Sequence, residues 1–443
     1  MNRFSLKTKI VCFTVSLLVF VVFQFPLTAF SAQETDQQNM NKGQRPEVIF
    51  PVISDVHIEK NGMEDLRKFE TALNQLNEHA PHQDAFVVVG DLTDYGLKEE
   101  YERFFSIYNE KKNPQAVSLF TIGNHDYWNG LSIEDAQKRF LDETGMGAIY
   151  GHKVIKDYHF IWLGPENGVT EGYYSKEQIQ WLDKQLNEAE KDDPRKPIFV
   201  FLHQPLTETV FGSEWGTVTN RDLLYNTLKK YPQSINFSGH THYPLDDPRT
   251  IHQENFTSVG TSSVKYMWTE AGYLQGELPP GHETISQGLI VEAYKNKVVI
   301  KRRDFHNDAW VGEDWVIKRP FKPQTFKYTE TRDHKAPYFT KDAEISAVKN
   351  PASSDRVVIK FTQADDNLLV HSYKVVAREK DTGQVALEYE AFSEYYRNPV
   401  PDPLLLPVQG LKPDTGYTIE VTAIDAFENE SQSNLTLDVK TKP

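Results

Sequence analysis

Apolar runs that are typical of buried strands alternate with amphipathic stretches of helical period along residues 47–306. The first two such runs read EVIFPVISD and DAFVVVGD, and residues 64–80 between them place leucines and a phenylalanine on one helical face. The alternation of strand and helix continues to residues 234–240 and predicts an α/β fold. Two successive strand patterns at 286–306 then predict an antiparallel hairpin at the edge of this domain.

A second domain is predicted beyond a lysine- and proline-rich linker at 318–338. The first domain then covers 47–317, and residues 339–443 hold several short strand patterns separated by turn residues. Such spacing is typical of an all-β sandwich of roughly 100 residues. The fold class is therefore α/β (α+β) with a C-terminal all-β sandwich domain.

The first 32 residues have the pattern of a secretory signal peptide. Basic residues precede an apolar run from Ile10 to Phe25, and Ala29 to Ser31 place small residues at a cleavage site. An uncleaved membrane anchor is the alternative, but the run is shorter than the ~20 residues that a spanning helix needs. Residues 33–46 read as a flexible leader. Either interpretation places the rest of the chain outside the cytoplasm, secreted or at the cell surface.

Cysteine and charge exclude several classes of function. Cys12 is the single cysteine and lies within the predicted signal, so the mature protein would have neither disulfides nor thiolate ligands. Any metal site must then use His, Asp, Asn or Glu. The formal net charge of −15 argues against binding to a nucleic-acid backbone, which favours a basic surface.

Polar side chains stand directly after five of the apolar strands. Taken singly, each group has a plain explanation as a helix cap or a turn. Turn chemistry does not need histidine, however, and four of the five groups contain one. Ligands bind at the carboxyl ends of strands in α/β sheets, so the set is typical of a metal site. In chain order the groups are Asp55 and His57; Asp91 and Asp94; Asn124, His125 and Asp126; His203; and His240 and His242.

The ordered blocks SDVH, GDLTD, GNHD, FLH and GHTH resemble those of the calcineurin-like metallophosphoesterases. The resemblance covers residues 47–306 and implies a two-sheet β-sandwich flanked by helices, with a dinuclear metal site above the sheets. It also implies two divalent metal ions, and oxygen and nitrogen donors admit Mn, Fe, Zn or Co. The implied ligands are Asp55, His57 and His242 for one ion, Asn124, His203 and His240 for the other, and Asp91 as the bridge.

The resemblance further implies hydrolysis of a phosphate ester by metal-bound hydroxide. His125 would face the substrate as a catalytic residue and Asp94 would orient and polarise it, although Asp94 also fits a helix cap. Within GHTH, the rings of His240 and His242 would reach different metals. A strand continuing through Gly239 would instead turn both rings to one face.

Departures from other subfamily patterns make the chain resemble most the bacterial, exported phosphodiesterase-like branch of this family, which implies a phosphodiester substrate. The block GDLTDY lacks the arginine–glycine that follows it in Ser/Thr protein phosphatases, and Tyr95 stands one position too late for the tyrosine ligand of purple acid phosphatases. A phosphomonoesterase of the same family and a non-catalytic, metal-stabilised adhesion or binding protein are the alternatives. The substrate would be a small-molecule or polymer phosphate ester. No substrate-binding residue is assigned, since Tyr266 and Trp268 fit both a pocket wall and ordinary packing.

The segment LKPDTGYTIEVTAIDAFENES resembles the late strands of a fibronectin type III domain. Tyr417 would form its tyrosine corner, with the hydroxyl bonded to upstream backbone. A cell-surface polymer is a partner that such a domain would fit. Five further histidines fit none of the blocks: His152, His159, His252, His282 and His306.

Overall fold

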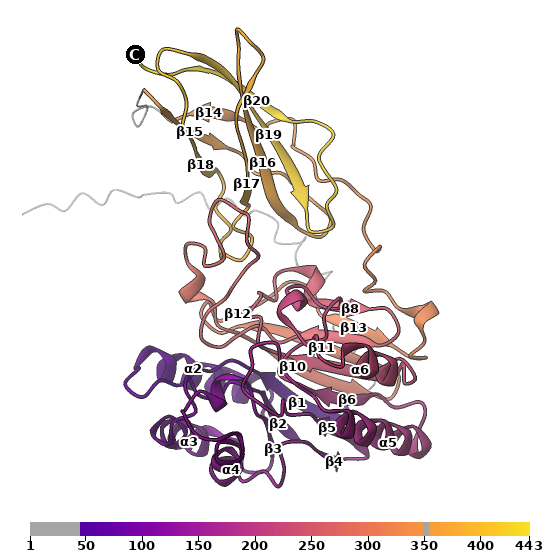
Figure 1. Ribbon diagram of the computed structural model, residues 1–443. Coiled ribbons are helices and arrows are strands. Elements are labelled where there is room, and N and C mark those ends of the chain that lie inside the picture. Colours follow the sequence, from indigo (N-terminus) through magenta and orange to yellow (C-terminus); the bar gives the residue numbers. More distant parts are fainter. Residues whose placement is uncertain (1–44, 349–353) are drawn as a thin grey trace, which may run out of the picture. The chain divides into compact units, whose positions relative to one another are not determined.

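Two β-sheets face each other across an apolar core in the computed structural model, which describes residues 45–348 and 354–443 (Figure 1). The predicted signal and nearly all of the predicted leader lie outside these residues. The first sheet has seven strands in the order β12-β11-β10-β1-β2-β3, with β13 also paired to β11. These strands are β1 (Val48–Ile53), β2 (Ala85–Val89), β3 (Val117–Thr121), β10 (Gln287–Tyr294), β11 (Lys297–Asp304), β12 (Ala309–Trp310) and β13 (Trp315–Lys318).

The second sheet has six strands in the order β4-β5-β6-β7-β9-β8. Strands β5, β6, β7 and β9 run parallel, as do β1, β2 and β3 in the first sheet, so each sheet collects several strand ends at one edge. The expected hairpin is formed by β10 and β11. The bounds are β4 (Gly151–Ile155), β5 (Tyr158–Trp162), β6 (Ile198–Phe201), β7 (Ser234–Ser238), β8 (Ile251–Gln253) and β9 (Thr257–Gly260).

Aromatic rings join the two sheets. Phe50 on β1 is fully buried, and its ring centroid lies 4.9 Å from that of Phe160 on β5 and 4.7 Å from that of Phe199 on β6. The interplanar angles of 71° and 67° are edge-to-face geometries that aromatic pairs prefer. The apolar side chains seen in the sequence thus form the layer between the sheets, and the expected two-sheet sandwich is confirmed.

Helices cover the outer faces of both sheets (Figure 1). Helices α2, α3 and α4 pack on the first sheet, and α5 and α6 pack on the second. Helix α5 begins where Ser175 Oγ accepts a hydrogen bond from Gln178 N–H at 3.1 Å, an N-cap that satisfies an otherwise unpaired donor. The bounds are α2 (Glu64–His79), α3 (Lys98–Lys111), α4 (Ile133–Thr144), α5 (Lys176–Asp192) and α6 (Arg221–Leu228).

Two further antiparallel sheets make up the C-terminal part of the chain and share one apolar core. The hydroxyl of Tyr417 accepts a hydrogen bond from Lys412 N–H at 2.8 Å, which is the expected tyrosine corner. Assignment to the fibronectin type III family and the domain limits stay predictions. The strands are β14 (Ile345–Ala347), β15 (Arg356–Phe361) and β18 (Leu404–Gln409) in one sheet, and β16 (Val370–Glu379), β17 (Val385–Phe392), β19 (Gly416–Asp425) and β20 (Leu435–Lys440) in the other.

Short 3₁₀ turns complete the structure. Within residues 45–348 and 354–443, none of the helices has the length and apolar character needed to cross a membrane. The turns are η1 (His125–Tyr127), η2 (Ser213–Trp215), η3 (Pro248–Thr250), η4 (His282–Thr284) and η5 (Pro323–Thr325).

Candidate metal centre

The polar groups predicted from the sequence meet at the carboxyl ends of strands β1, β2, β3, β6 and β7, so both sheets contribute. Glycines permit this close approach. A Cβ at Gly239 would collide with the Asp55 carboxylate, and a Cβ at Gly90 would collide with the ring of His203. The block patterns GD and GHTH therefore carry their glycines because neighbouring loops pass within contact distance of each other.

Left-handed backbone conformations cluster in these loops. Such conformations are uncommon for residues with a side chain, and strain of this kind gathers at functional sites. The residues concerned have φ between 46° and 71° and are Asp55, His57, Asp91, His240 and His242.

The first group of candidate ligands consists of Asp55, His57 and His242, whose ligand atoms all lie within 4.8 Å of one another. The Nε2 atoms of the two histidines are 3.1 Å apart. Asp55 Oδ1 lies 3.1 Å from His242 Nε2 and 3.8 Å from His57 Nε2. Three donors therefore converge on one point, as a single cation would require.

The second group consists of Asp91, His203 and His240, again within 4.8 Å of one another. Asn124 joins it through Oδ1, which lies 3.1 Å from His203 Nε2. Asp91 Oδ2 lies 3.1 Å from His203 Nε2 and 3.7 Å from His57 Nε2, which places it between the two groups. The two histidines of GHTH thus belong to different groups, as the expected geometry required.

Backbone carbonyls orient two of the imidazoles. Val89 O lies 2.9 Å from His203 Nδ1, and Tyr266 O lies 3.0 Å from His242 Nδ1. A carbonyl only accepts, so each Nδ1 carries the proton and each Nε2 presents its lone pair to the centre. This is the arrangement in which metal-binding histidines are usually held.

Electrostatics indicate that the centre lacks positive charge without a cation. Burial opposes ionisation of Asp55 and Asp91, but neighbouring histidines hold the pKa of both carboxyls well below the usual range. Burial likewise opposes protonation of His57, yet the nearby carboxylates of Asp55 and Asp94 raise its pKa to about 9. Asp91 outweighs burial in the same way and raises the pKa of His203 to about 9. The two histidines therefore gain protons that balance the two ionised carboxylates, a role that bound divalent cations would take over.

His240 provides an independent test of that fit. Its Nε2 is buried and has no hydrogen-bond partner among the described residues. Burial lowers its pKa to about 3, so the ring stays neutral with an available lone pair. A buried unpaired acceptor is costly unless something binds it. The oxygen and nitrogen donors of the two groups fit Mn, Fe, Zn or Co.

His125 belongs to neither of the expected ligand sets, although its ring, His57 and Asp91 form a third group whose possible ligand atoms lie within 4.8 Å of one another. Its Nδ1 is 2.9 Å from the backbone carbonyl of Asp94, and its backbone N–H donates to Asp91 Oδ1 at 2.9 Å. Its ring lies against Trp128, with centroids 3.8 Å apart. Burial lowers the pKa of His125. The residue is therefore held at the edge of the centre by two contacts of its ring and one of its backbone.

The Asp94 carboxylate does not contact His125, although the sequence predicted that it would polarise that ring. The carboxylate instead lies 3.4 Å from His57 Nδ1 and 3.4 Å from Lys265 Nζ. The reason is in the backbone, because Asp94 N–H donates to Ile58 O at 3.1 Å, in a short bridge beside His57. Asp94 is not a helix cap either, since α3 begins at Lys98.

Two residues with structural roles here were not assigned one from the sequence. Lys265 Nζ bonds to Glu59 Oε1 at 2.6 Å and to the carbonyl of His57 at 3.2 Å, and no motif marks it. Asp126 accepts hydrogen bonds from Gly123 N–H at 3.0 Å and from Thr93 Oγ1 at 2.6 Å. It is fully buried, which raises its pKa to about 6, and it braces the loop that carries Asn124 and His125.

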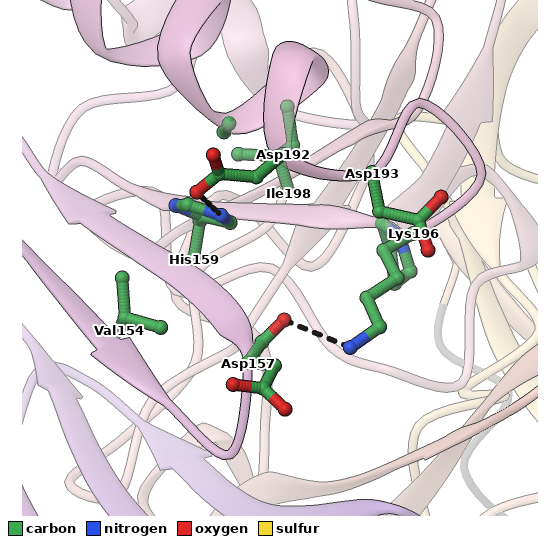
Figure 2. A pocket seen from close by; sticks show the side chains of 9 residues that line it. Val154, Asp157, His159, Asp192, Asp193, Lys196 and Ile198 are labelled. Atoms are coloured by element: carbon green, nitrogen blue, oxygen red, sulfur yellow. Dashed lines mark hydrogen bonds and ion pairs between the residues drawn. The ribbon is translucent and has the colours of Figure 1, made fainter.

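Two of the unassigned histidines pair with each other elsewhere. His152 Nε2 lies 2.9 Å from His159 Nδ1, and His159 Nε2 lies 3.3 Å from Asp192 Oδ2. Figure 2 shows His159 and Asp192 in a pocket of about 340 Å³ that also holds Lys196. It lies at the amino-terminal ends of β5 and β6, whereas the candidate centre lies at the carboxyl ends. It therefore contributes nothing to that centre.

Comparison with known proteins agrees with the geometry. Residues 50–244 match the family described as Calcineurin-like phosphoesterase. A probable glycerophosphodiester phosphodiesterase of Arcobacter nitrofigilis is 29% identical over 43% of this chain and 70% of its own length. A 3′,5′-cyclic-nucleotide phosphodiesterase of Nostoc sp. is 27% identical over 49% of this chain and 78% of its own.

Among solved structures, a purple acid phosphatase from yellow lupin (Lupinus luteus) aligns with a TM-score of 0.42 at 14% identity. The alignment covers 61% of this chain and 53% of that one.

Proposed function

Because residues 50–244 match the calcineurin-like phosphoesterase family, we propose that this chain is a two-metal-dependent hydrolase of phosphodiesters. The observation that carries the proposal is the pair of ligand groups that share Asp91, with His125 held beside them. Similarity to two phosphodiesterases supports a diester over a monoester. A phosphomonoesterase of the same family is the alternative that the experiment below distinguishes.

Seven residues would hold the metals in two groups. Two divalent ions, when bound, supply Lewis acidity at a phosphoryl oxygen and lower the pKa of a water molecule. Asp55 and Asp91 bring only two negative charges, and the amide and imidazole donors are neutral. The loaded centre is therefore cationic and attracts an anionic ester. The proposed ligands are Asp55, His57 and His242, then Asn124, His203 and His240, with Asp91 shared.

His125 is the proposed proton donor to the leaving oxygen. The carbonyl of Asp94 fixes the Nδ1 proton and so leaves Nε2 as the atom that exchanges a proton with substrate. The contact with Trp128 prevents the ring from rotating out of place. In this role Asp94 positions His125 through its backbone, and its carboxylate positions the ligand His57.

Export and the C-terminal domain are separate parts of the proposal. Residues 1–32 have the pattern of a signal peptide, which supports a site of action outside the cytoplasm. The C-terminal sheets and the Tyr417 corner support a fibronectin type III-like module. Such a module suits attachment to a cell-surface polymer, with the phosphoester substrate delivered to the first domain.

The test compares two chromogenic substrates with purified residues 33–443. We expect bis(p-nitrophenyl) phosphate to be hydrolysed faster than p-nitrophenyl phosphate with added Mn²⁺, and a chelator to stop both reactions. Asp91→Ala should abolish turnover and lower metal content. His125→Ala should lower the rate about 10²–10⁴-fold while metal stays bound, as expected for a lost proton donor.

Each negative result removes a different part of the proposal. Absence of turnover of both substrates with Mn, Fe, Zn and Co would leave the chain as a metal-stabilised binding protein. Faster hydrolysis of the monoester would remove the diester preference alone. Loss of metal from His125→Ala would show that this residue is a ligand.

A further inference from the structure

A pocket of about 450 Å³ adjoins the candidate centre and shares two residues with its wall. One is Lys265, whose ammonium lies 3.4 Å from the Asp94 carboxylate. The other is Tyr266, whose ring centroid lies 4.8 Å from that of His242. A group attached to a phosphate at the centre would therefore reach this pocket.

Aromatic rings form one side of the pocket. The ring centroids of Tyr266 and Trp268 are 6.4 Å apart, and both residues line it. Trp268 also packs edge-to-face against Trp215, at a centroid distance of 5.4 Å and an interplanar angle of 76°. The faces of such rings carry negative electrostatic potential and attract cations.

Carboxylates outnumber ammonium groups in the lining. Four acids stand against two lysines; both ammonium groups already have partners, and one acid, Glu64, pairs with Arg67 outside the lining. Lys265 is paired with a lining acid at 2.6 Å, and Lys68 donates to the backbone carbonyls of Lys265 and Glu283. The lining acids are Glu59, Glu64, Asp65 and Glu283.

One of these acids, Asp65, has a carboxylate oxygen without a hydrogen-bond partner. Asp65 is only 3% exposed, and its Oδ2 accepts from Glu59 N–H at 2.6 Å. Its Oδ1 is buried and has no hydrogen-bond partner in the described part of the chain. A buried carboxylate oxygen in this state favours a cationic or proton-donating ligand group.

We propose that this pocket binds the quaternary ammonium head of a choline-type amino alcohol esterified to the phosphate at the centre. The inference rests on the proposed phosphodiesterase function and specifies its substrate class as a zwitterionic phosphodiester. The anionic phosphate faces the cationic metal centre. The positive head faces the two aromatic rings and the excess of carboxylates.

Two esters that differ only in charge test the proposal. In p-nitrophenyl phosphocholine the head is quaternary ammonium, and in p-nitrophenyl 3,3-dimethylbutyl phosphate a carbon replaces that nitrogen. Both release p-nitrophenol, so the chemistry of the leaving group is held constant. We expect kcat/KM to favour the choline ester about 10-fold, as a desolvated cation–π contact allows.

Variants locate the preference within the pocket. Trp268→Leu and Asp65→Asn should each bring the ratio of the two kcat/KM values toward one. The matched control is Trp310→Leu, a half-exposed tryptophan on β12 that lies outside the pocket and should leave both rates unchanged.

Direct binding separates this inference from the proposed function. Tryptophan fluorescence titrations with phosphocholine and with 3,3-dimethylbutyl phosphate measure the same preference without turnover. Preferential binding of phosphocholine without hydrolysis of either ester would support the pocket and overturn the phosphodiesterase proposal. Equal binding and equal hydrolysis of the two compounds would overturn the pocket and leave the phosphodiesterase in place. Stronger competition by an uncharged nucleoside than by choline would also overturn it.

Discussion

Replacing Asp94 by asparagine separates the two contacts that this residue makes. The backbone carbonyl that holds His125 at 2.9 Å is unchanged by the substitution. The carboxylate contacts to His57 Nδ1 and Lys265 Nζ, both 3.4 Å, lose their charge. The substitution should therefore act on the ligand His57 and leave the proton donor in place.

The size of the effect follows from the exposure of the carboxylate. Loss of a partner that orients a metal ligand typically costs 10–100-fold in metal affinity or activity. The side chain of Asp94 is 22% exposed, and solvent therefore screens part of the interaction. We expect Asp94→Asn to weaken metal binding about 10-fold. With saturating metal, kcat should fall less than about 3-fold, far below the 10²–10⁴-fold expected for His125→Ala.

The assay is a Mn²⁺ titration of the metal-free protein, read both as bound metal and as hydrolysis of bis(p-nitrophenyl) phosphate. Asp183→Asn is the matched control, because Asp183 is an exposed acid that pairs with Lys230 far from the centre. A kcat for Asp94→Asn as low as that of His125→Ala at saturating metal would refute the assignment. It would mean that the carboxylate acts on the proton donor after all.

Two further predictions concern packing and charge. Gly239→Ala places a methyl group against the Asp55 carboxylate, so metal content and activity should both fall. The control is Gly383→Ala, at an open turn with positive φ, which should change stability only. Unchanged metal content in Gly239→Ala would contradict the close approach. Burial raises the pKa of Asp246 to about 6. An acid whose pKa is higher in the folded protein than in the unfolded chain stabilises the fold most below its unfolded-state pKa of about 4. That stabilisation is lost as the pH rises through about 6. Asp246→Asn should therefore be more stable than the parent protein at pH 8, by about 2 kcal/mol once partial exposure is allowed for, and this gain should vanish near pH 4 in urea unfolding. An equal difference at both pH values would show that Asp246 is not the titrating group.

The buried strands could be predicted because their residues are apolar throughout. Runs such as those of β1 and β2 are covered on both faces, so the sequence signal is continuous. Strands at sheet edges gave no such signal. β4 is half exposed with a histidine and a lysine in it, and β14 is three residues long, and neither was predicted. Helix α4 was missed although Ser132, followed by Glu134 and Asp135, is a capping pattern.

The gathering of these polar groups at one place was predictable because each block follows a strand end. Their division between two metals, with His240 and His242 on different ions, was implied by the resemblance to calcineurin-like metallophosphoesterases. Contacts made by the backbone could not be predicted in this way. Whether Asp94 meets His125 through its carboxylate or its carbonyl depends on the direction of one peptide group. Lys265 joins the centre from a loop after β9 that has no motif of its own.

The most direct test of a shared two-metal centre is the number of Mn²⁺ ions bound per chain, measured with the spin coupling between them. The parent protein should bind two Mn²⁺ with an EPR signal typical of a coupled pair. His240→Ala and His242→Ala should each retain one uncoupled ion, because the two histidines lie in different ligand groups. A single ion in the parent protein, or loss of the same ion in both variants, would contradict the account.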